Sequence, residues 1–334
     1  MLSGLDSKMH RGTIGVLAAV RSLESFVTSR DYTAETLLFR PRSFADDPGL
    51  WLNITPELAG WDFISFQARR LAAGEAWRFS TDDEELALVT LSGSYNVTTS
   101  RGEWSDVGGR ASVFAGIAHT LYLPRRTAGV VATRHGGEIA VARSPSGKDH
   151  DPFLIRPEDV ATFIRGGDNA TRQINQLIPP GAPVERLVLV EVYTPTGSWS
   201  SFPPHKHDVH RANVEGGLIE ADLEEVYFFK IDRPDGYALQ HIYTDPASPL
   251  HQQGRPIDAL IKVSNNEAVI VPEGYHPVAS PPGYTTYYLN ALAGSAQSLA
   301  CVDDPRHAWI RETYRTRDDR VPLYPLPHVP IYEI

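Results

Sequence analysis

The feature that most limits how this chain can fold is the frequency with which glycine and proline interrupt it. The 334 residues include 26 glycines and 26 prolines, which separate short runs rich in Val, Ile, Leu, Phe and Tyr. Long segments with the apolar period of about 3.6 residues are scarce, whereas short apolar runs bounded by turn residues are typical of β-sandwiches and β-barrels. The sequence therefore predicts an all-β fold with little helix.

The predicted strands fall into two groups, which indicates two domains in a chain of this length. The first group covers residues 61–68, 85–91, 94–98, 111–114, 119–123 and 129–132, and the second covers 186–193, 225–231, 236–243, 267–271 and 285–289. A short helix is expected from Pro157 to Phe163. The predicted organisation is an extension at 1–30, a first domain at 31–155, a connection at 156–180, a second domain at 181–300, and a Pro-rich tail at 301–334 that runs extended from Pro322 to Pro330.

The two halves share a repeated pattern. In the first half the acidic segment Asp82–Glu85 precedes an apolar run, and a glycine turn then leads to His119. In the second half Asp222–Glu225 precedes an apolar run, and a Pro-x-Gly turn leads to His276. The pattern aligns the acidic pair that ends at Glu85 with the pair that ends at Glu225. Because the first half has no His-x-His before its acidic pair, the sequence predicts a duplicated fold in which only the second half binds a metal.

Two histidines, His205 and His207, stand on either side of Lys206. Because side chains alternate between the two faces of a strand, both imidazoles project to one side, while Lys206 projects to the other and is expected to lie at the surface or at an interface. His276 and a carboxylate of the pair Glu224-Glu225 complete a candidate set of three histidines and one glutamate. Such a set suits one divalent Zn, Fe, Mn, Ni or Co ion with open positions for substrate.

Six segments extend this pattern well beyond the candidate ligands. They are Gly197 to Asp208, Leu223 to Tyr227, Gln240 to Asp245, Val271 to Val278, Gly283 to Asn290 and Asp304 to Ile310. Over roughly residues 35–315 the chain resembles the cupin superfamily and, within it, the 5-deoxy-glucuronate isomerase family, which are bicupins of myo-inositol catabolism. The resemblance implies two cupin β-barrels in one chain, the first without the metal motif, and conversion of 5-deoxy-glucuronate to 5-dehydro-2-deoxygluconate.

The resemblance also bears on which glutamate binds the metal. In many cupins the glutamate follows His-x-His after a few residues, whereas here residues 208–223 intervene as a predicted loop. Glu225 directly precedes a run with three aromatic residues and fits the usual ligand position, and Glu224 is the alternative. The ligand set implied by the resemblance is His205, His207, Glu225 and His276.

Isomerisation of an aldose to a ketose needs a Lewis acid at the carbonyl and a group that moves a proton between neighbouring carbons, unless a hydride shifts directly. The candidate bases are Glu224, Glu191, His241 and Tyr237. The candidates for binding substrate hydroxyls are Gln240, Tyr243, Tyr275, Tyr287 and Asn290. The basic residues that could bind the substrate carboxylate are Arg172, Lys206, Lys230, Lys262 and Arg186, of which Arg172 is the candidate we select. For the hydroxyl-binding candidates, a packed core position is an equally valid interpretation of the sequence.

Three other functions use a similar sequence pattern. One is a related uronate ketol-isomerase of pectin breakdown, and another is an iron-dependent cupin dioxygenase with the same three-histidine, one-glutamate site. The third is a non-catalytic sugar-binding cupin. Oxygen consumption would separate a dioxygenase from an isomerase, and metal content without turnover would favour the binding protein.

Composition excludes several classes of protein. The net charge of −10 argues against non-specific nucleic-acid binding, which needs a basic surface. No apolar run is long enough to span a bilayer, the segment Thr13 to Val20 is too short for a signal peptide, and the single Cys301 excludes an internal disulfide. We therefore expect a cytoplasmic enzyme that acts on a small uronate-type sugar acid, without nucleic-acid or membrane partners. Its exposed β edges favour a homo-oligomer.

Overall fold

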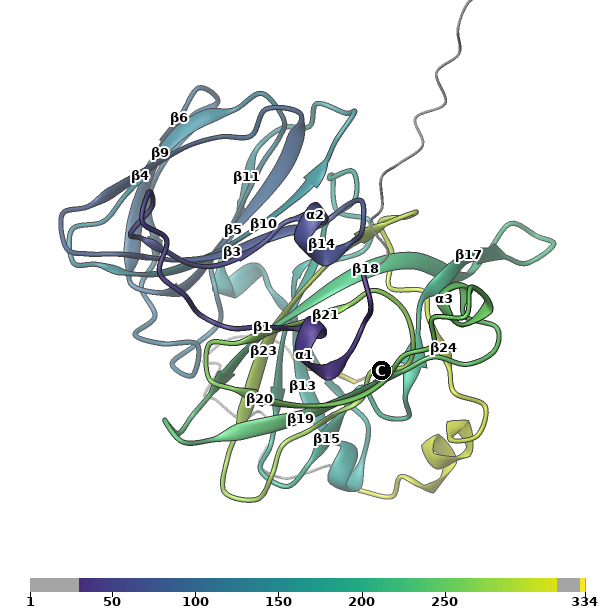
Figure 1. Cartoon of the computed structure of the whole chain (residues 1–334). Helices are drawn as coiled ribbons and strands as arrows, with labels where there is room; N and C mark the ends of the chain where they lie inside the picture. The colour runs from purple at the N-terminus through teal and green to yellow at the C-terminus, as the bar shows by residue number, and fades with distance from the viewer. Residues whose placement is uncertain (1–29, 317–330, 334) are drawn as a thin grey trace, which may run out of the picture.

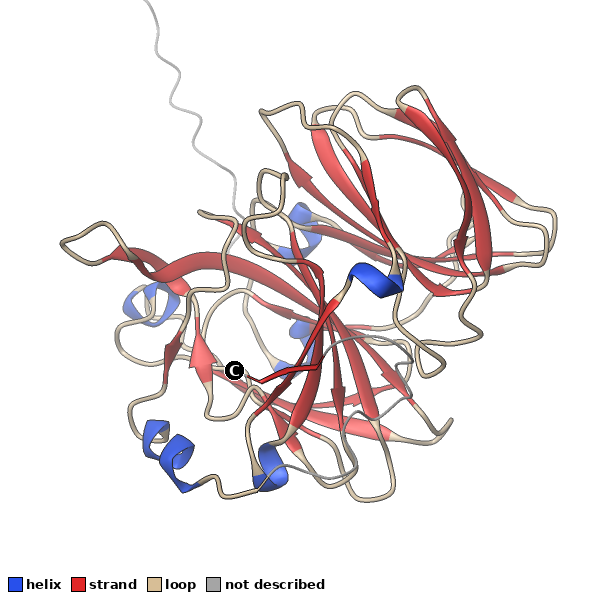
Figure 2. Ribbon diagram, turned by 180° about the vertical axis from the view of Figure 1, so that it is seen from behind, coloured by secondary structure: helices blue, strands red, loops and turns tan. Residues whose placement is uncertain are grey.

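The computed structural model describes residues 30–316 and 331–333, which form two β-rich halves side by side (Figure 1). Strands make up nearly all of the regular structure (Figure 2), so the all-β prediction is confirmed. The short helices are α1 (Ala34–Leu37), α2 (Pro56–Ala59) and α3 (Pro249–Gln252), with 3-10 turns η1 (Pro157–Asp159), η2 (Asp168–Ala170) and η3 (Ala308–Thr313). Within the described part of the chain, no helix has the length and apolar character needed to cross a bilayer.

The first half contains two sheets. The larger has the order β11-β8-β5-β10-β3-β2 and comprises β2 (Leu50–Ile54), β3 (Ser65–Leu71), β5 (Glu84–Ser92), β8 (Thr120–Leu123), β10 (Gly137–Pro145) and β11 (Phe153–Ile155). The smaller has the order β4-β9-β6-β7 and comprises β4 (Ala76–Ser80), β6 (Ser94–Thr99), β7 (Gly102–Gly108) and β9 (Ala128–Ala132). The core shared by these two sheets is apolar and includes Leu86, Leu88, Leu121, Val141, Val97 and Val131.

The second half is built on a nine-stranded sheet with the order β1-β21-β18-β23-β14-β13-β12-β25, in which β17 also pairs with β18. Its strands are β1 (Leu38–Phe39), β12 (Ala161–Arg165), β13 (Arg172–Ile178), β14 (Val188–Thr194), β17 (Asp208–Ala212), β18 (Leu218–Ile231), β21 (Ala268–Val271), β23 (Thr286–Gly294) and β25 (Ile331–Glu333). A four-stranded sheet contains β15 (Trp199–Ser200), β22 (Val278–Ala279), β19 (Tyr237–Tyr243) and β20 (Asp258–Ser264). A two-stranded sheet pairs β16 (His205–Lys206) with β24 (Val302–Asp303).

The six-stranded and nine-stranded sheets pack against each other and join the two halves. The alternation of side chains on β5 shows how: Leu88 contributes to the core of the first half, whereas Val89 belongs to a cluster that also contains Phe228 of β18. Because successive residues of a strand face opposite ways, one face of the six-stranded sheet lines the core of the first half and the other packs against the nine-stranded sheet. Burial of both faces explains why residues 86–89 of β5 and 226–229 of β18 are continuously apolar rather than alternating.

Two buried glutamates fasten the halves to each other in matching ways. Glu85 on β5 accepts hydrogen bonds of 2.8 Å from the backbone N–H groups of residues 185–187, just before β14. Glu224 on β18 accepts hydrogen bonds of 2.5–2.8 Å from the N–H groups of residues 62–64, just before β3. The equivalent of Glu85 is therefore Glu224, one residue earlier than the alignment expected from the sequence, and Leu86 occupies the position that corresponds to Glu225.

Three segments fold differently from the expectation. Residues 111–114, expected as a strand, form bends and a turn. The helix expected over 157–163 is a single 3-10 turn followed by β12, because Pro157 begins a turn that ends at Val160. Residues 208–223, expected as a loop, form a hairpin of β17 and β18 that turns at residues 213–217. The glutamate therefore follows the histidines through an antiparallel pairing, which brings the two motifs together.

The predicted connection at 156–180 contains β12 and β13, which belong to the nine-stranded sheet. The boundaries at residues 155, 180 and 300, and the closure of each half into a barrel, stay predictions. The predicted extension lies outside the described residues except for Arg30, and so does the extended path from Pro322 to Pro330.

Candidate metal centre

Three potential ligands meet inside the second half. His207 follows β16, Glu225 lies on β18, and His276 lies in the connection between β21 and β22. Each offers one atom to a group whose members all lie within 4.8 Å of one another, and all three residues are buried. Glu225 Oε2 lies 3.0 Å from His207 Nε2 and 3.3 Å from His276 Nε2. One carboxylate oxygen therefore contacts two imidazole nitrogens.

The backbone contacts of the two rings show which nitrogen carries the proton. His207 Nδ1 lies 2.8 Å from the carbonyl oxygen of Leu223, and His276 Nδ1 lies 2.7 Å from that of Gly274. A carbonyl oxygen can only accept, so both Nδ1 atoms donate, and in the neutral rings the Nε2 lone pairs face Glu225.

A divalent cation fits this arrangement better than a proton does. His276 Nε2 is buried and makes no hydrogen bond with any described group. A proton on His207 Nε2 would satisfy one of the two contacts with Glu225, whereas a metal ion can accept all three lone pairs. Histidine ligands commonly donate their second ring N–H to a backbone carbonyl, as both do here.

The charge states of the histidines support the same fit. Burial lowers the pKa of His276, and burial together with the positive charges of His276 and His207 holds the pKa of His205 well below its usual value. Burial alone would also lower the pKa of His207, but its hydrogen bond to Glu225 and the charge of that carboxylate raise it. At neutral pH His205 and His276 are therefore neutral, which is the form that binds metals.

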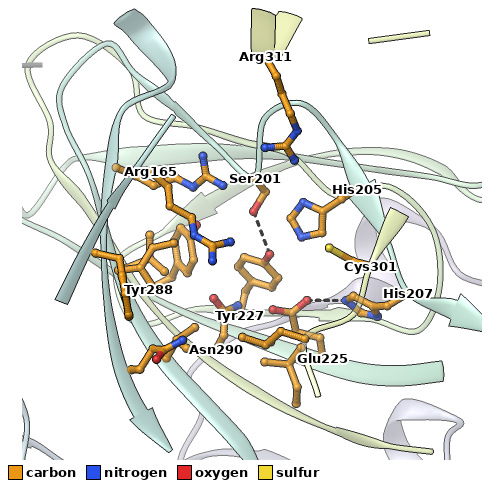
Figure 3. A pocket seen from close by; sticks show the side chains of 18 residues that line it. Arg165, Ser201, His205, His207, Glu225, Tyr227, Tyr288, Asn290, Cys301 and Arg311 are labelled. Carbon is orange, nitrogen blue, oxygen red and sulfur yellow. Dashed lines mark hydrogen bonds and ion pairs between the residues drawn. The ribbon is translucent and has the colours of Figure 1, made fainter. Parts of the chain in front are cut away.

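His205 lies beside the three-residue group but outside it. Its ring centroid is 4.8 Å from that of His276, and it lines the same cavity as His207 and Glu225. Figure 3 shows His205 and His207 on the same side of the pocket. Of the four ligands expected from the sequence, the structure thus brings three within ligand distance and places the fourth next to them.

A buried network holds the turn that carries His276. The backbone N–H of Gly274 donates to Asp208 Oδ1 over 2.6 Å, and Asp208 also accepts hydrogen bonds from Ser248 and lies 3.2 Å from Lys206 Nζ. Gly274 has φ +98°, and a Cβ there would lie 2.6 Å from the carbonyl oxygen of Tyr243, so only glycine fits. Lys206 pairs with Asp208 and Asp245 and is buried between them, so its expected position at the surface or at an interface is wrong.

A small cavity of about 120 Å³ opens beside the ligands. Its polar lining residues include Arg165, Arg172, Ser201, His205, His207, Glu225, Tyr227, Tyr288, Asn290 and Arg311 (Figure 3). Arg172 and Asn290 are the substrate-binding candidates that the structure brings to this cavity. Sequence reasoning did not identify Arg165, Arg311, Ser201 and Tyr288 as lining residues. It did not identify Tyr227 either, although this residue shares a strand face with Glu225 and could have been found from that alternation.

None of the four candidate bases lines this cavity. Glu224 binds residues 62–64 on the opposite face of β18. Glu191 lies at the interface between the halves, where it pairs with Arg110 over 2.9 Å and accepts a hydrogen bond from Tyr287 over 3.1 Å. Tyr287, expected to bind substrate, is thus also an interface residue.

The remaining candidates lie on β19, except for Tyr275, which forms a β-bridge with Tyr243 from the connection between β21 and β22. His241, Tyr243 and Tyr275 line a second, wider groove of about 980 Å³, where His241 pairs with an exposed aspartate. Tyr237 packs against another tyrosine and a lysine side chain. Gln240 is fully buried, and neither polar atom of its side chain has a partner among the described residues.

Comparison with known proteins gives one family. A model described as the KduI/IolB family matches residues 37–310. A 5-deoxy-glucuronate isomerase of Geobacillus kaustophilus is 37% identical over 277 residues, which are 83% of this chain and 96% of that protein. One from Bacillus subtilis strain 168 is 34% identical over 280 residues, which are 83% of this chain and 98% of that protein.

Solved structures agree with this result. The crystal structure of an IolB-like protein from Salmonella typhimurium LT2 superposes with a TM-score of 0.74 at 35% identity and covers 82% of this chain and 98% of its own. An oxalate decarboxylase from Lactobacillus farciminis superposes with a TM-score of 0.53 at 11% identity over 82% of this chain and 88% of its own, and it shares the fold alone. The family resemblance inferred from the sequence is confirmed, and the chain belongs to the KduI/IolB family.

Proposed function

We propose that the protein is a metal-dependent aldose–ketose isomerase that converts 5-deoxy-glucuronate to 5-dehydro-2-deoxygluconate in myo-inositol catabolism in the cytoplasm. The observation that carries this proposal is the convergence of His207, Glu225 and His276 beside a polar cavity that His207 and Glu225 line. It occurs in a chain that is 37% identical to a 5-deoxy-glucuronate isomerase over 83% of its length. The cofactor is one divalent ion among Zn, Mn, Fe, Ni and Co.

The residues that would hold the ion are His207, Glu225 and His276. His205 is the fourth ligand expected from the sequence, and its role is tested below. When bound, the ion supplies a Lewis acid for the C1 carbonyl and C2 hydroxyl oxygens of the sugar acid. The hydrogen bonds from the two Nδ1 atoms to backbone carbonyls keep the rings oriented toward Glu225. Fixed ligands of this kind need no rearrangement when the substrate enters.

Tyr227 and Ser201 supply hydroxyl groups in the same cavity. Their side-chain oxygens lie 3.2 Å apart, and burial raises the pKa of Tyr227 well above its usual value. Tyr227 therefore stays protonated and can donate a hydrogen bond to a substrate oxygen that gains negative charge.

The role of His205 separates two forms of the mechanism. Among the residues that line the cavity, it is the imidazole outside the three-atom group, and its low pKa keeps it unprotonated at neutral pH. It can serve as the fourth ligand or as the base that moves the proton between C2 and C1. In His205→Gln, a loss of metal would identify a ligand, whereas retained metal with lost turnover would identify the base.

The experiment that tests the function is an isomerisation assay on the full chain. Protein stripped of metal by a chelator and then reconstituted separately with each of the five ions should convert 5-deoxy-glucuronate to the 2-keto product with at least one of them. The unsaturated uronate from pectin breakdown is the comparison substrate. Faster turnover of that substrate, or no turnover of either with a fully loaded site, would refute the proposed function.

A further inference from the structure

Three arginines surround the cavity beside the metal ligands. Arg165 on β12 and Arg172 on β13 are directly opposite each other in the antiparallel pair, so their side chains lie on the same face. Both line the cavity, as does Arg311 from η3. Figure 3 shows Arg165 across the pocket from His207, and Arg311 above both. This positive cluster occurs in a protein with a net charge of −10.

Arg172 is a buried cation without an anionic partner in residues 30–316. It is 8% exposed, and its guanidinium donates hydrogen bonds of 3.5 Å to the carbonyl oxygens of Ala170 and Phe202. Arg110 is equally buried but pairs with Glu191 over 2.9 Å. An unpaired buried charge is costly, and two like charges directly opposite each other in a sheet add to that cost.

The other two arginines are placed to complete a site for an anion. Arg165 is exposed, and it makes no ion pair with any residue in the range 30–316. Arg311 is about half exposed and is held by Asp303, whose oxygens lie 2.5 and 2.7 Å from its Nε and Nη2. Burial, with the charges of Arg165 and Arg311 adding to it, lowers the pKa of Arg172. An anion in the cavity would relieve this repulsion and would accept hydrogen bonds from the planar guanidinium groups.

We propose that Arg172, with Arg165 and Arg311 at the mouth of the cavity, forms the subsite that binds the carboxylate of the sugar acid. This inference rests on the proposed function and extends it, because it orients the substrate with its carboxylate toward the arginines and its carbonyl end toward Glu225 and His207. It also defines specificity, because a neutral sugar of the same length would leave the buried charge of Arg172 unpaired.

A matched pair of probes tests the subsite without turnover. D-Gluconate and D-glucitol are open-chain compounds that differ by a carboxylate in place of a terminal CH₂OH group. Calorimetric titration of metal-loaded protein should show at least tenfold tighter binding of D-gluconate. Arg172→Met should reduce that preference to about one, and Arg165→Met and Arg311→Met should each reduce it severalfold. Arg70→Met, which changes an exposed arginine of the first half, is the matched control and should leave it unchanged.

The same titration on metal-free protein separates the arginines from direct chelation. If the arginines bind the carboxylate, the preference for D-gluconate persists without metal and still depends on Arg172. If it disappears without metal and is the same in all three variants, the carboxylate binds the ion and the inference is wrong. If Arg172→Met does not fold, Arg165→Met and Arg311→Met provide the same test.

Kinetics distinguish a failure of the subsite from a failure of the proposed function. If the wild-type protein isomerises 5-deoxy-glucuronate, Arg172→Met should raise KM at least tenfold. A normal KM in that variant overturns the subsite and leaves the isomerase standing. Absence of turnover in the wild type, together with binding of D-gluconate that depends on Arg172, overturns the isomerase and leaves the subsite standing.

Discussion

The interiors of the two halves differ far more than their architectures do. The core of the first half consists of apolar side chains, such as Leu86 and Leu121, whereas the cavity of the second half is lined by His207, Glu225 and Arg172. Buried charges cost free energy of folding, and the cluster that forms the core of the first half contains none. The interior of the first half therefore contributes packing, whereas the interior of the second half contains the candidate metal site.

The largest expected effect on activity comes from substituting a candidate metal ligand inside the second half. His207→Ala and Glu225→Gln should each lower bound metal and activity by roughly a hundredfold or more, because each removes a ligand and not only an orienting partner. Both variants should keep the β-rich circular dichroism spectrum of the wild type, since two apolar cores remain. Metal content by elemental analysis and turnover of 5-deoxy-glucuronate are the measurements, and global unfolding of either variant would contradict the comparison.

The converse change introduces a charged side chain into the apolar core of the first half. Leu86→Glu places a carboxylate in the first half at the position that corresponds to Glu225, where its neighbours are apolar. It should lower the free energy of unfolding by several kcal/mol, because the charge finds no partner. Leu86→Met is the control for shape and should cost less than about 1.5 kcal/mol. Denaturant unfolding measures both, and equal stability of the two variants would show that this interior is not dry.

Substitution of the two interface glutamates, Glu85 and Glu224, tests whether these residues are equivalent in the two halves. In Glu85→Gln and Glu224→Gln an amide N–H₂ replaces an oxygen that accepts from backbone N–H groups, so each should lose about 1–3 kcal/mol of stability. Similar losses are expected because the two sets of contacts match. Both variants should retain metal, and Glu84→Gln, at a half-buried neighbour, is the control. Loss of metal from Glu224→Gln alone would mean that the wrong glutamate has been assigned to the ion.

Acidification should weaken metal binding in the second half. The pKa of His207 is raised above its usual value by Glu225, so it is the first of the three histidines to gain a proton as pH falls. A protonated imidazole has no lone pair to donate, and below that pKa the affinity should fall by about tenfold per pH unit. Metal titrations between about pH 5 and 8 measure this dependence. A flat profile would show that His207 is not a ligand.

The smallest effect is expected at His119, which occupies the position in the first half that corresponds to His276. Leu121 and Leu123 of the following strand β8 belong to the apolar core, and His119 is not part of the group of potential ligands found among the described residues. His119→Ala should therefore retain metal and most activity. Reduced metal content in this variant would show that the first half takes part in binding after all.

Patterns within short segments were enough to predict the fold class and the candidate ligands. Turn residues between short apolar runs indicated strands, and His-x-His, the acidic pair and the Pro-x-Gly turn each depend on alternation or on a local bend. The structure brings His207, Glu225 and His276 together as this reasoning expected. Where a local pattern was ambiguous, as at residues 111–114, the prediction was wrong.

Strand register and the contact between the halves decided what the sequence could not. Arg165 and Arg172 share a site because β12 and β13 pair with that register, and Glu224 is an interface residue because it meets residues 62–64, some 160 positions away. The burial of Lys206 likewise follows from Asp245, on a different strand connection. Periodicity fixes which face of its own strand a side chain takes, whereas its neighbours across strands and sheets are set by packing of the whole chain.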